Sequence, residues 1–167
     1  SRRHFLTAAA AAGCSVGYTA TTPGARLVAV PNAPENGCPL RVWRPGELEL
    51  HFVYTGCGES MFYRFPDGTA MVNDTGDYFR PHELQFIPRL PSAARLGGEW
   101  MTRYIRRVAP GLDTLDYMML SHWHNDHSGA PLLRTVAARD GRRVCGLALV
   151  GENFRVKRFY DHQFPNH

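Results

Sequence analysis

The side chains best suited to chemistry lie between Leu120 and Gly129, in the stretch Leu-Ser-His-Trp-His-Asn-Asp-His-Ser-Gly. Within it, six consecutive residues contain three imidazoles and one carboxylate, which belong to His122, His124, Asp126 and His127. Zinc accepts imidazole nitrogens and carboxylate oxygens as ligands, and manganese and iron bind the same donor types. The alternative is a polar loop with incidental histidines, which the concentration of His and Asp in this order disfavours. The residue types therefore predict a metal site.

The spacing of the first two histidines indicates how the chain runs at this site. On an extended chain His122 and His124 project from the same side, whereas on a helix they would point roughly 200° apart. Residues 117–120, just upstream, form a short apolar run typical of a buried parallel strand. Residues 131–139, downstream, have helical spacing. The pattern places the ligands where a central strand gives way to a helix, the usual crevice for ligands beside such sheets.

Upstream of the histidines, the sequence predicts a run of short strands. Residues 48–54 alternate apolar and polar side chains, and residues 60–65 form a second β-type run. The tight-turn signal Pro66-Asp-Gly-Thr joins this run to a strand over residues 69–73. The strand is followed by Asp74, whose carboxylate can hold a loop by accepting backbone hydrogen bonds; an Asp in an ordinary turn is the alternative.

The run His122-Trp-His-Asn-Asp-His127 resembles the HxHxDH signature of the metallo-β-lactamase superfamily, a group of zinc-dependent hydrolases. The resemblance implies that His122 and His124 bind one zinc ion and that Asp126 and His127 bind a second. Two-metal sites commonly place their ions about 3.5–4 Å apart. By the same resemblance Asp126 has a catalytic role, because it would orient the nucleophile as well as bind metal.

The resemblance extends to the predicted strands and turns. Gly56-Cys-Gly-Glu, the Pro-Asp-Gly turn and Asp74-Thr-Gly76 are most similar to the branch that includes the hydrolase domain of the competence DNA-uptake channel protein. The similarity spans residues 47 to about 161. It implies that Asp74 and Gly76 give structural support to the metal loop.

The resemblance also implies a fold, an α+β or α/β chain arranged as a four-layer αββα sandwich. The superfamily requires a third His for the first metal, a bridging Asp and a last His on later strands. Residues 144–150 predict a further buried strand, but His162 and His167 are better explained as exposed imidazoles in a polar end. We therefore expect residues 47–167 to hold largely the N-terminal half of the sandwich, as a fragment. A chain complete at this length would expose a sheet edge and an apolar face, and would aggregate or dimerise.

Residues 1–25 resemble a twin-arginine export signal, with Ser-Arg-Arg-His-Phe-Leu followed by an alanine-rich stretch. Ala11-Ala-Gly-Cys14 is similar to a weak lipoprotein-processing box, in which Cys14 would carry a lipid anchor; the alternatives are cleavage near Ala20 or Ala25 and an Ala-rich helix. Residues 26–46 are rich in Pro and predict a linker. These features predict an exported protein, periplasmic or extracellular, with membrane anchoring through lipid as one form.

The composition fits one globular domain, with 167 residues of which 44% are hydrophobic and 20% charged. The formal charge of +4 favours an anionic substrate. The four cysteines show no CxxC spacing, which argues against a cysteine zinc site and leaves open both a Cys38–Cys57 disulfide and free buried thiols. Residues 93–108 predict an amphipathic helix. Its Arg103, Arg106 and Arg107 are best explained as a solvated face, and a basic strip that faces a phosphate-bearing substrate is the alternative.

Together these features predict an exported metal-dependent hydrolase that uses a metal-activated water, with zinc, two ions per complete domain, as the expected metal. Metal binding lowers the pKa of water to about 7, far below its value in bulk. The expected substrates are phosphodiesters or other anionic compounds, either small molecules or derived from nucleic acid. Hydrolysis of a β-lactam or small ester, and a non-catalytic exported binding protein that keeps the fold, are the alternatives.

Overall fold

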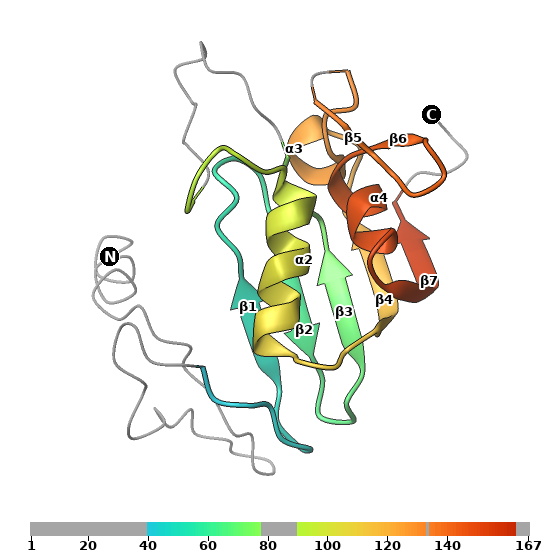
Figure 1. Cartoon of the computed structure of the whole chain (residues 1–167). Helices are drawn as coiled ribbons and strands as arrows, with labels where there is room; N and C mark the ends of the chain where they lie inside the picture. The colour runs from blue at the N-terminus through green and yellow to red at the C-terminus, as the bar shows by residue number, and fades with distance from the viewer. Residues whose placement is uncertain (1–39, 78–89, 133, 163–167) are drawn as a thin grey trace.

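The central sheet begins as an antiparallel hairpin and continues as parallel strands. The computed structural model describes residues 40–77, 90–132 and 134–162 (Figure 1). The spatial order is β1-β2-β3-β4-β7, in which β1, β2 and β3 pair antiparallel and β3, β4 and β7 pair in parallel. The five strands are β1 Glu49–Phe52, β2 Met61–Arg64, β3 Ala70–Asn73, β4 Thr114–Leu120 and β7 Arg155–Asp161.

Two helices cover one face of this sheet, α2 (Gly97–Val108) and α4 (Gly146–Gly151), as Figure 1 shows. The single-turn helix α3 (Asn125–Ser128) follows β4, and a small hairpin of β5 (Val136–Ala137) and β6 (Arg143–Val144) follows α3. Apolar side chains from both layers fill the space between helices and sheet, each contributing about 1.5–3 kcal/mol on burial. They include Phe62, Val72, Met101, Ile105, Leu120 and Val150. The described residues therefore form an α+β fold, as predicted.

The helix predicted over residues 93–108 is confirmed, although it begins later, at Gly97. Met101, Ile105 and Val108 recur at helical spacing and are buried against the sheet. The Glu99 carboxylate accepts a hydrogen bond of 2.8 Å from the backbone N–H of Leu96. This bond satisfies one of the free amides at the helix start, which explains why the helix does not begin at residue 93.

The predicted strands before the helix are also confirmed. Gly68 donates its backbone N–H to the Phe65 carbonyl at 2.9 Å, and Phe65 donates its own to the Thr69 carbonyl at 2.9 Å. These two bonds close the turn between β2 and β3, where Gly68 has a φ of 88°. The strand expected just before the histidines is β4, which is flanked on both sides by parallel neighbours.

Two predictions for the later part of the chain are wrong. The described residues among 131–139 form no helix: Leu132 is 97% exposed, and β5 takes up Val136–Ala137. Residues 144–150 form the end of β6 and then α4 instead of a strand. The polar end of the chain includes β7, whose side chains are mostly exposed, so no apolar pattern marked it. In each case strand pairing and packing in the fold decide between helix and strand, because the local sequence pattern favours neither clearly.

The second face of the sheet is not covered by helices within the described residues. In β1 the polar Glu49 and His51 lie on the less exposed side, whereas Leu50 and Phe52 are 46% and 72% exposed. The strand register places Leu50 in a row of paired residues that crosses the sheet, one from each strand. The row is Leu50, Tyr63, Met71, Tyr117 and Arg158. The sheet thus carries apolar side chains on both faces.

Several predictions fall on parts of the chain outside the described residues. They are the export signal over residues 1–25, the lipid-bearing Cys14, most of the linker, the Cys38 half of the disulfide, and His167. Residues 40–46 of the predicted linker form neither helix nor strand. Among the described helices, none has the length and apolar character needed to cross a bilayer.

Candidate metal centre

The candidate centre lies where two parallel strands end side by side. β3 ends at Asn73 and β4 ends at Leu120, so the next residues, Asp74 and Ser121, start two adjacent loops. The backbone N–H of Asp74 donates to the Met119 carbonyl at 3.0 Å, which extends the ladder to this edge. This is the carboxyl edge of the parallel part of the sheet, the position at which such sheets generally place ligands.

Asp74 is the buried anchor of the centre. It is fully buried and has a φ of 51°, a left-handed conformation that Asp tolerates better than most residues. Its Oδ1 accepts the backbone N–H of Ser121 at 2.8 Å. Its Oδ2 accepts the Ser121 hydroxyl at 2.6 Å, the Asn73 amide at 3.2 Å and His127 Nδ1 at 2.9 Å. Four donors thus occupy one carboxylate and hold the two loops together.

These bonds define which nitrogens of the histidines remain for a ligand. A carboxylate accepts hydrogen bonds, so His127 carries its proton on Nδ1 and presents a bare Nε2. The Ser121 hydroxyl gives its one proton to Asp74, and it lies 3.0 Å from His122 Nδ1. It therefore accepts from His122, which leaves Nε2 of that ring bare as well. Asp74 and Ser121 together set the tautomers of two candidate ligands.

The three histidine rings of the motif gather at this edge. The ring centroids of His122 and His124 lie 4.7 Å apart, and those of His122 and His127 lie 4.0 Å apart. A ring nitrogen bound about 2.1 Å from zinc puts the ring centroid about 3 Å from the ion, so tetrahedral neighbours have centroids about 5 Å apart. The observed separations of 4.7 and 4.0 Å are shorter than that spacing. The residue types of the three rings suit a zinc-type ion.

The side chains of Asp126 and His127 are also separated by a distance that suits two ligands of one cation. Asp126 Oδ2 lies 3.7 Å from His127 Nε2, the nitrogen that the Asp74 bond leaves bare. This separation is too long for a good hydrogen bond, and it is close to the about 3.4 Å between two ligands of one tetrahedral ion. The Asp126 side chain is 35% exposed, so solvent reaches it.

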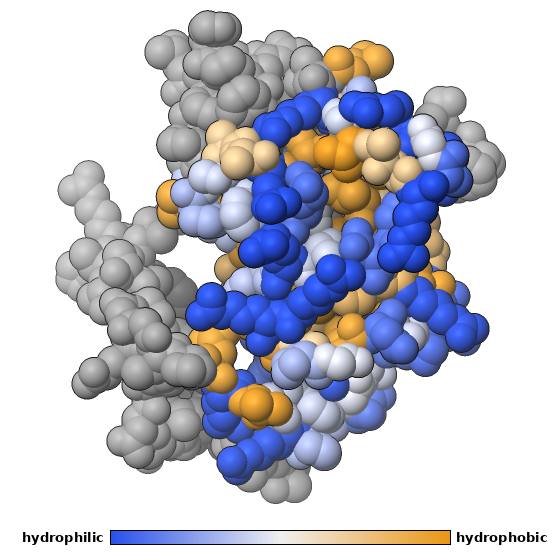
Figure 2. Space-filling model, in the orientation of Figure 1, coloured by the Kyte–Doolittle hydropathy of each residue, from blue (hydrophilic) through white to orange (hydrophobic). Residues whose placement is uncertain are grey.

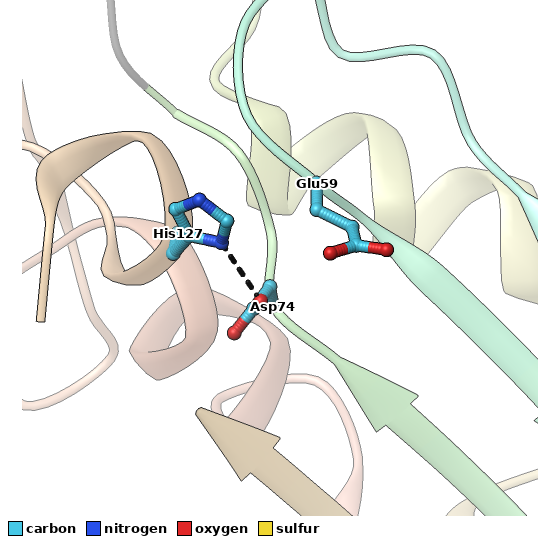
Figure 3. Close-up of side chains that lie close together, drawn as sticks. All are labelled: Glu59, Asp74 and His127. Carbon is cyan, nitrogen blue, oxygen red and sulfur yellow. Dashed lines mark hydrogen bonds and ion pairs between the residues drawn. The ribbon is translucent and has the colours of Figure 1, made fainter. Parts of the chain in front are cut away.

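Glu59 joins the centre from a third segment. One ligand atom each of Glu59, Asp74 and His127 lies within 4.8 Å of the others, a group that could hold a metal ion (Figure 3). Within the described parts of the chain, this is the single group of three or more such residues at that spacing, so His122, His124 and Asp126 stand outside it. Glu59 was missed as a ligand in the sequence, where it appears only as the last residue of the Gly-x-Gly-Glu turn. Ser121 was missed as well, because an isolated hydroxyl carries no pattern.

Glycines allow the loops of the centre to approach closely. Gly58 has a φ of 78°, and a Cβ there would overlap the Asp126 carbonyl group. A Cβ on Gly76 would overlap Thr55 Oγ1 and lie 2.5 Å from the Cys57 carbonyl oxygen. The backbone N–H groups of Thr75 and Gly76 donate to the carbonyls of His127 and Glu59, at 3.0 and 2.8 Å. Gly76 thus lies where its own loop after β3 meets the loop that carries Glu59 and the segment that carries Asp126 and His127.

Asp77, which the sequence did not single out, connects the centre to both helices. It is 3% exposed, and its two carboxylate oxygens accept the backbone N–H groups of Gly97 at 2.7 Å and Gly146 at 3.2 Å. These residues are the first of α2 and α4. A negative charge at a helix start is favourable because the first amides are unpaired there. The loop after Asp74 is therefore fixed to the two helices that cover the sheet.

The other residues considered in the sequence lie around this centre. Trp123 is 46% exposed, and its indole Nε1–H donates to Asp161 at the end of β7 at 3.1 Å. His162 follows β7 and is exposed, as expected. Cys145 is buried at the start of α4, where burial raises the pKa of its thiol to about 11, so the thiol stays protonated at neutral pH.

Comparison with protein-family models, with curated proteins and with solved structures finds no significant match for this chain. The function of the protein is therefore inferred from its residues and their geometry. The metallo-β-lactamase resemblance remains a prediction from the motif.

Proposed function

We propose that the protein is a metal-dependent hydrolase of the metallo-β-lactamase type that acts on phosphodiesters or other anionic substrates. The observation that carries the proposal is the hydrogen-bond chain from Asp74 through Ser121 to His122, with its branch to His127. This chain holds the proton of both rings on Nδ1 and leaves both Nε2 atoms free to bind a cation. Carboxylate-to-histidine bonds of this kind commonly orient metal-binding histidines.

The proposal assigns a role to each of the three histidines and to the two aspartates of the centre. His122 and His124 hold one ion and Asp126 with His127 a second, in line with the 3.7 Å between Asp126 Oδ2 and His127 Nε2. Asp74 orients rather than binds, because its four hydrogen-bond donors leave its oxygens little room for metal. Zinc is the expected metal, and manganese and iron accept the same ligands. When bound, the metal would lower the pKa of water to about 7, far below its value in bulk, and so supply hydroxide at neutral pH.

The proposed fold is the N-terminal part of a four-layer αββα sandwich. Its support is the second sheet face, on which Leu50, Phe52 and Met119 are 46%, 72% and 37% exposed. Apolar side chains on both faces are expected of a sheet that packs between a helix layer and another sheet. Export and a lipid anchor at Cys14 are part of the same proposal and rest on the sequence alone.

The test is hydrolysis of bis(p-nitrophenyl) phosphate by the purified full chain, together with analysis of its bound metal. We expect turnover that chelation removes and added zinc restores. We expect His124→Ala to lose both turnover and bound metal, because its ring supplies a ligand. The matched control is His162→Ala, an exposed histidine after β7, which should keep both. Unchanged turnover after the metal has been removed would refute the proposal.

A further inference from the structure

A groove lies between α2 and the edge strand β1, apart from the metal centre. It has a volume of about 710 Å³, which is within the range of about 300–1,000 Å³ typical of ligand pockets. One stripe of α2 supplies one wall, through Trp100, Arg103, Tyr104 and Arg107 at successive spacings of three, one and three residues. Tyr54, just after β1, faces this stripe across the groove, and Arg106 also contributes to the lining.

The groove is strongly basic, and its arginines form no ion pair with a carboxylate in the part of the chain that the structure describes. Arg103, Arg106 and Arg107 are exposed, and no carboxylate of the described residues lies within ion-pair distance of them. Arg106 instead bonds the neutral Asn153 amide oxygen at 3.1 Å. Figure 2 shows hydrophilic residues gathered over the outer side of α2. The arginines are exposed to solvent, as predicted, and they also line a concave surface of positive charge. Such a surface raises the local concentration of anions.

Aromatic rings are interleaved with these charges and are held in place. The Tyr104 hydroxyl lies 3.0 Å from Nδ1 of the buried His51, whose Nε2 lies 3.3 Å from Glu49 Oε2. This buried chain fixes the Tyr104 ring as part of the wall. Trp100 has the Arg95 and Arg103 guanidinium groups each 5.8 Å from its ring centre. Tyr54 is 47% exposed, so a ring face there is open to a ligand.

We propose that this groove binds single-stranded nucleic acid. A groove that combines positive charge with open ring faces suits a phosphate backbone whose bases can stack. An acidic peptide would use the charges but has little use for the rings, and a flat anionic membrane does not enter a hollow. The groove is also close to the metal centre along the chain, since Tyr54 leads directly into the turn that contains Gly58 and Glu59.

Binding is tested without metal, so the result is independent of the proposed hydrolase activity. The full chain is titrated against a fluorescein-labelled oligothymidylate of about 20 nucleotides in chelator, and anisotropy is followed at several salt concentrations. We expect the Arg103→Gln/Arg107→Gln double variant to bind more weakly and to lower the slope of log affinity against log salt by about 1.4, since each lost phosphate contact on a single strand accounts for about 0.7. The matched control removes two exposed arginines elsewhere, Arg139→Gln/Arg155→Gln, and should bind as the parent does.

A second variant tests the stacking part of the proposal. Tyr54→Ala should weaken binding about tenfold without changing the salt slope, because it removes a ring and no charge. Circular dichroism checks that each variant keeps its fold. Equal weakening by the two arginine pairs would overturn the proposal, since it would show binding by net charge alone. Groove-dependent binding of labelled polyglutamate or of anionic vesicles, without binding of the oligonucleotide, would overturn it as well.

Discussion

Among the residues that the structure describes, two histidines have carboxylate partners, and they differ in what the second ring nitrogen does. His51 uses both nitrogens within the fold, one toward Glu49 and the other toward the Tyr104 hydroxyl. His127 gives Nδ1 to Asp74 and keeps Nε2, which lies 3.7 Å from Asp126 Oδ2. A carboxylate beside a histidine therefore does not by itself mark a metal site. The bare second nitrogen, at an edge reached by solvent, makes the difference.

The largest expected effect comes from the carboxylate that orients His127. Asp74→Asn keeps the shape of the side chain but puts an amide group where His127 and Ser121 donate. The protons of the His122 and His127 rings are then no longer held on Nδ1, so Nε2 of each ring is no longer kept available for a metal. We expect metal affinity to fall by about 10–100-fold, as measured by competition with a zinc chelator. Glu49→Gln makes the same change beside His51 and should leave metal affinity unchanged. Equal effects of the two substitutions would remove the distinction between the two histidines.

A smaller effect is expected at Gly58, which allows Asp126 to lie beside His127. Gly58→Ala puts a methyl group into the Asp126 carbonyl at a positive φ, so we expect a loss of about 2 kcal/mol in the free energy of unfolding together with weaker metal binding. Gly111→Ala is the control, with a φ of 83° and open space around its Cβ position. It should cost about 1 kcal/mol and leave metal binding intact. Urea unfolding and the chelator competition measure the two quantities.

The smallest effect concerns the pH dependence that His51 gives to stability. Burial lowers the pKa of His51, and the nearby Glu49 offsets part of that shift. Below the unfolded value of about 6.5 the unfolded chain binds the proton while the folded protein does not, so stability falls with falling pH until the folded pKa is passed. We expect His51→Gln to reduce the change of the urea unfolding midpoint with pH, in the range between about 6.5 and the pKa of His51 in the folded protein. An unchanged pH profile would show that the burial of His51 has no energetic effect.

Local sequence was enough to predict the elements whose side chains carry a period or a turn signal. The hairpin of β2 and β3, the strand β4 and the helix α2 all show such patterns, and His122 and His124 follow from residue type and spacing. β7 did not show a pattern, because its stability comes from backbone pairing with β4 while its side chains remain exposed. The hairpin β5–β6 was hidden for a similar reason.

The parts of the centre that the sequence did not reveal come from segments brought together only by the fold. Glu59 reaches Asp74 and His127 through a turn held by Gly58 and Gly76. Ser121 acquires its role only because Asp74 lies next to it at the ends of parallel strands. Neither role can be derived from neighbours in the chain, since both depend on strand order.

Asp77 has a consequence for how the molecule opens. Because one buried carboxylate accepts the first amides of both α2 and α4, a movement of Asp77 disturbs the starts of both helices together. The amide protons of the two helices should therefore exchange with deuterated solvent as one cooperative unit. The metal loop, which shares this segment of chain, would lose its support in the same event.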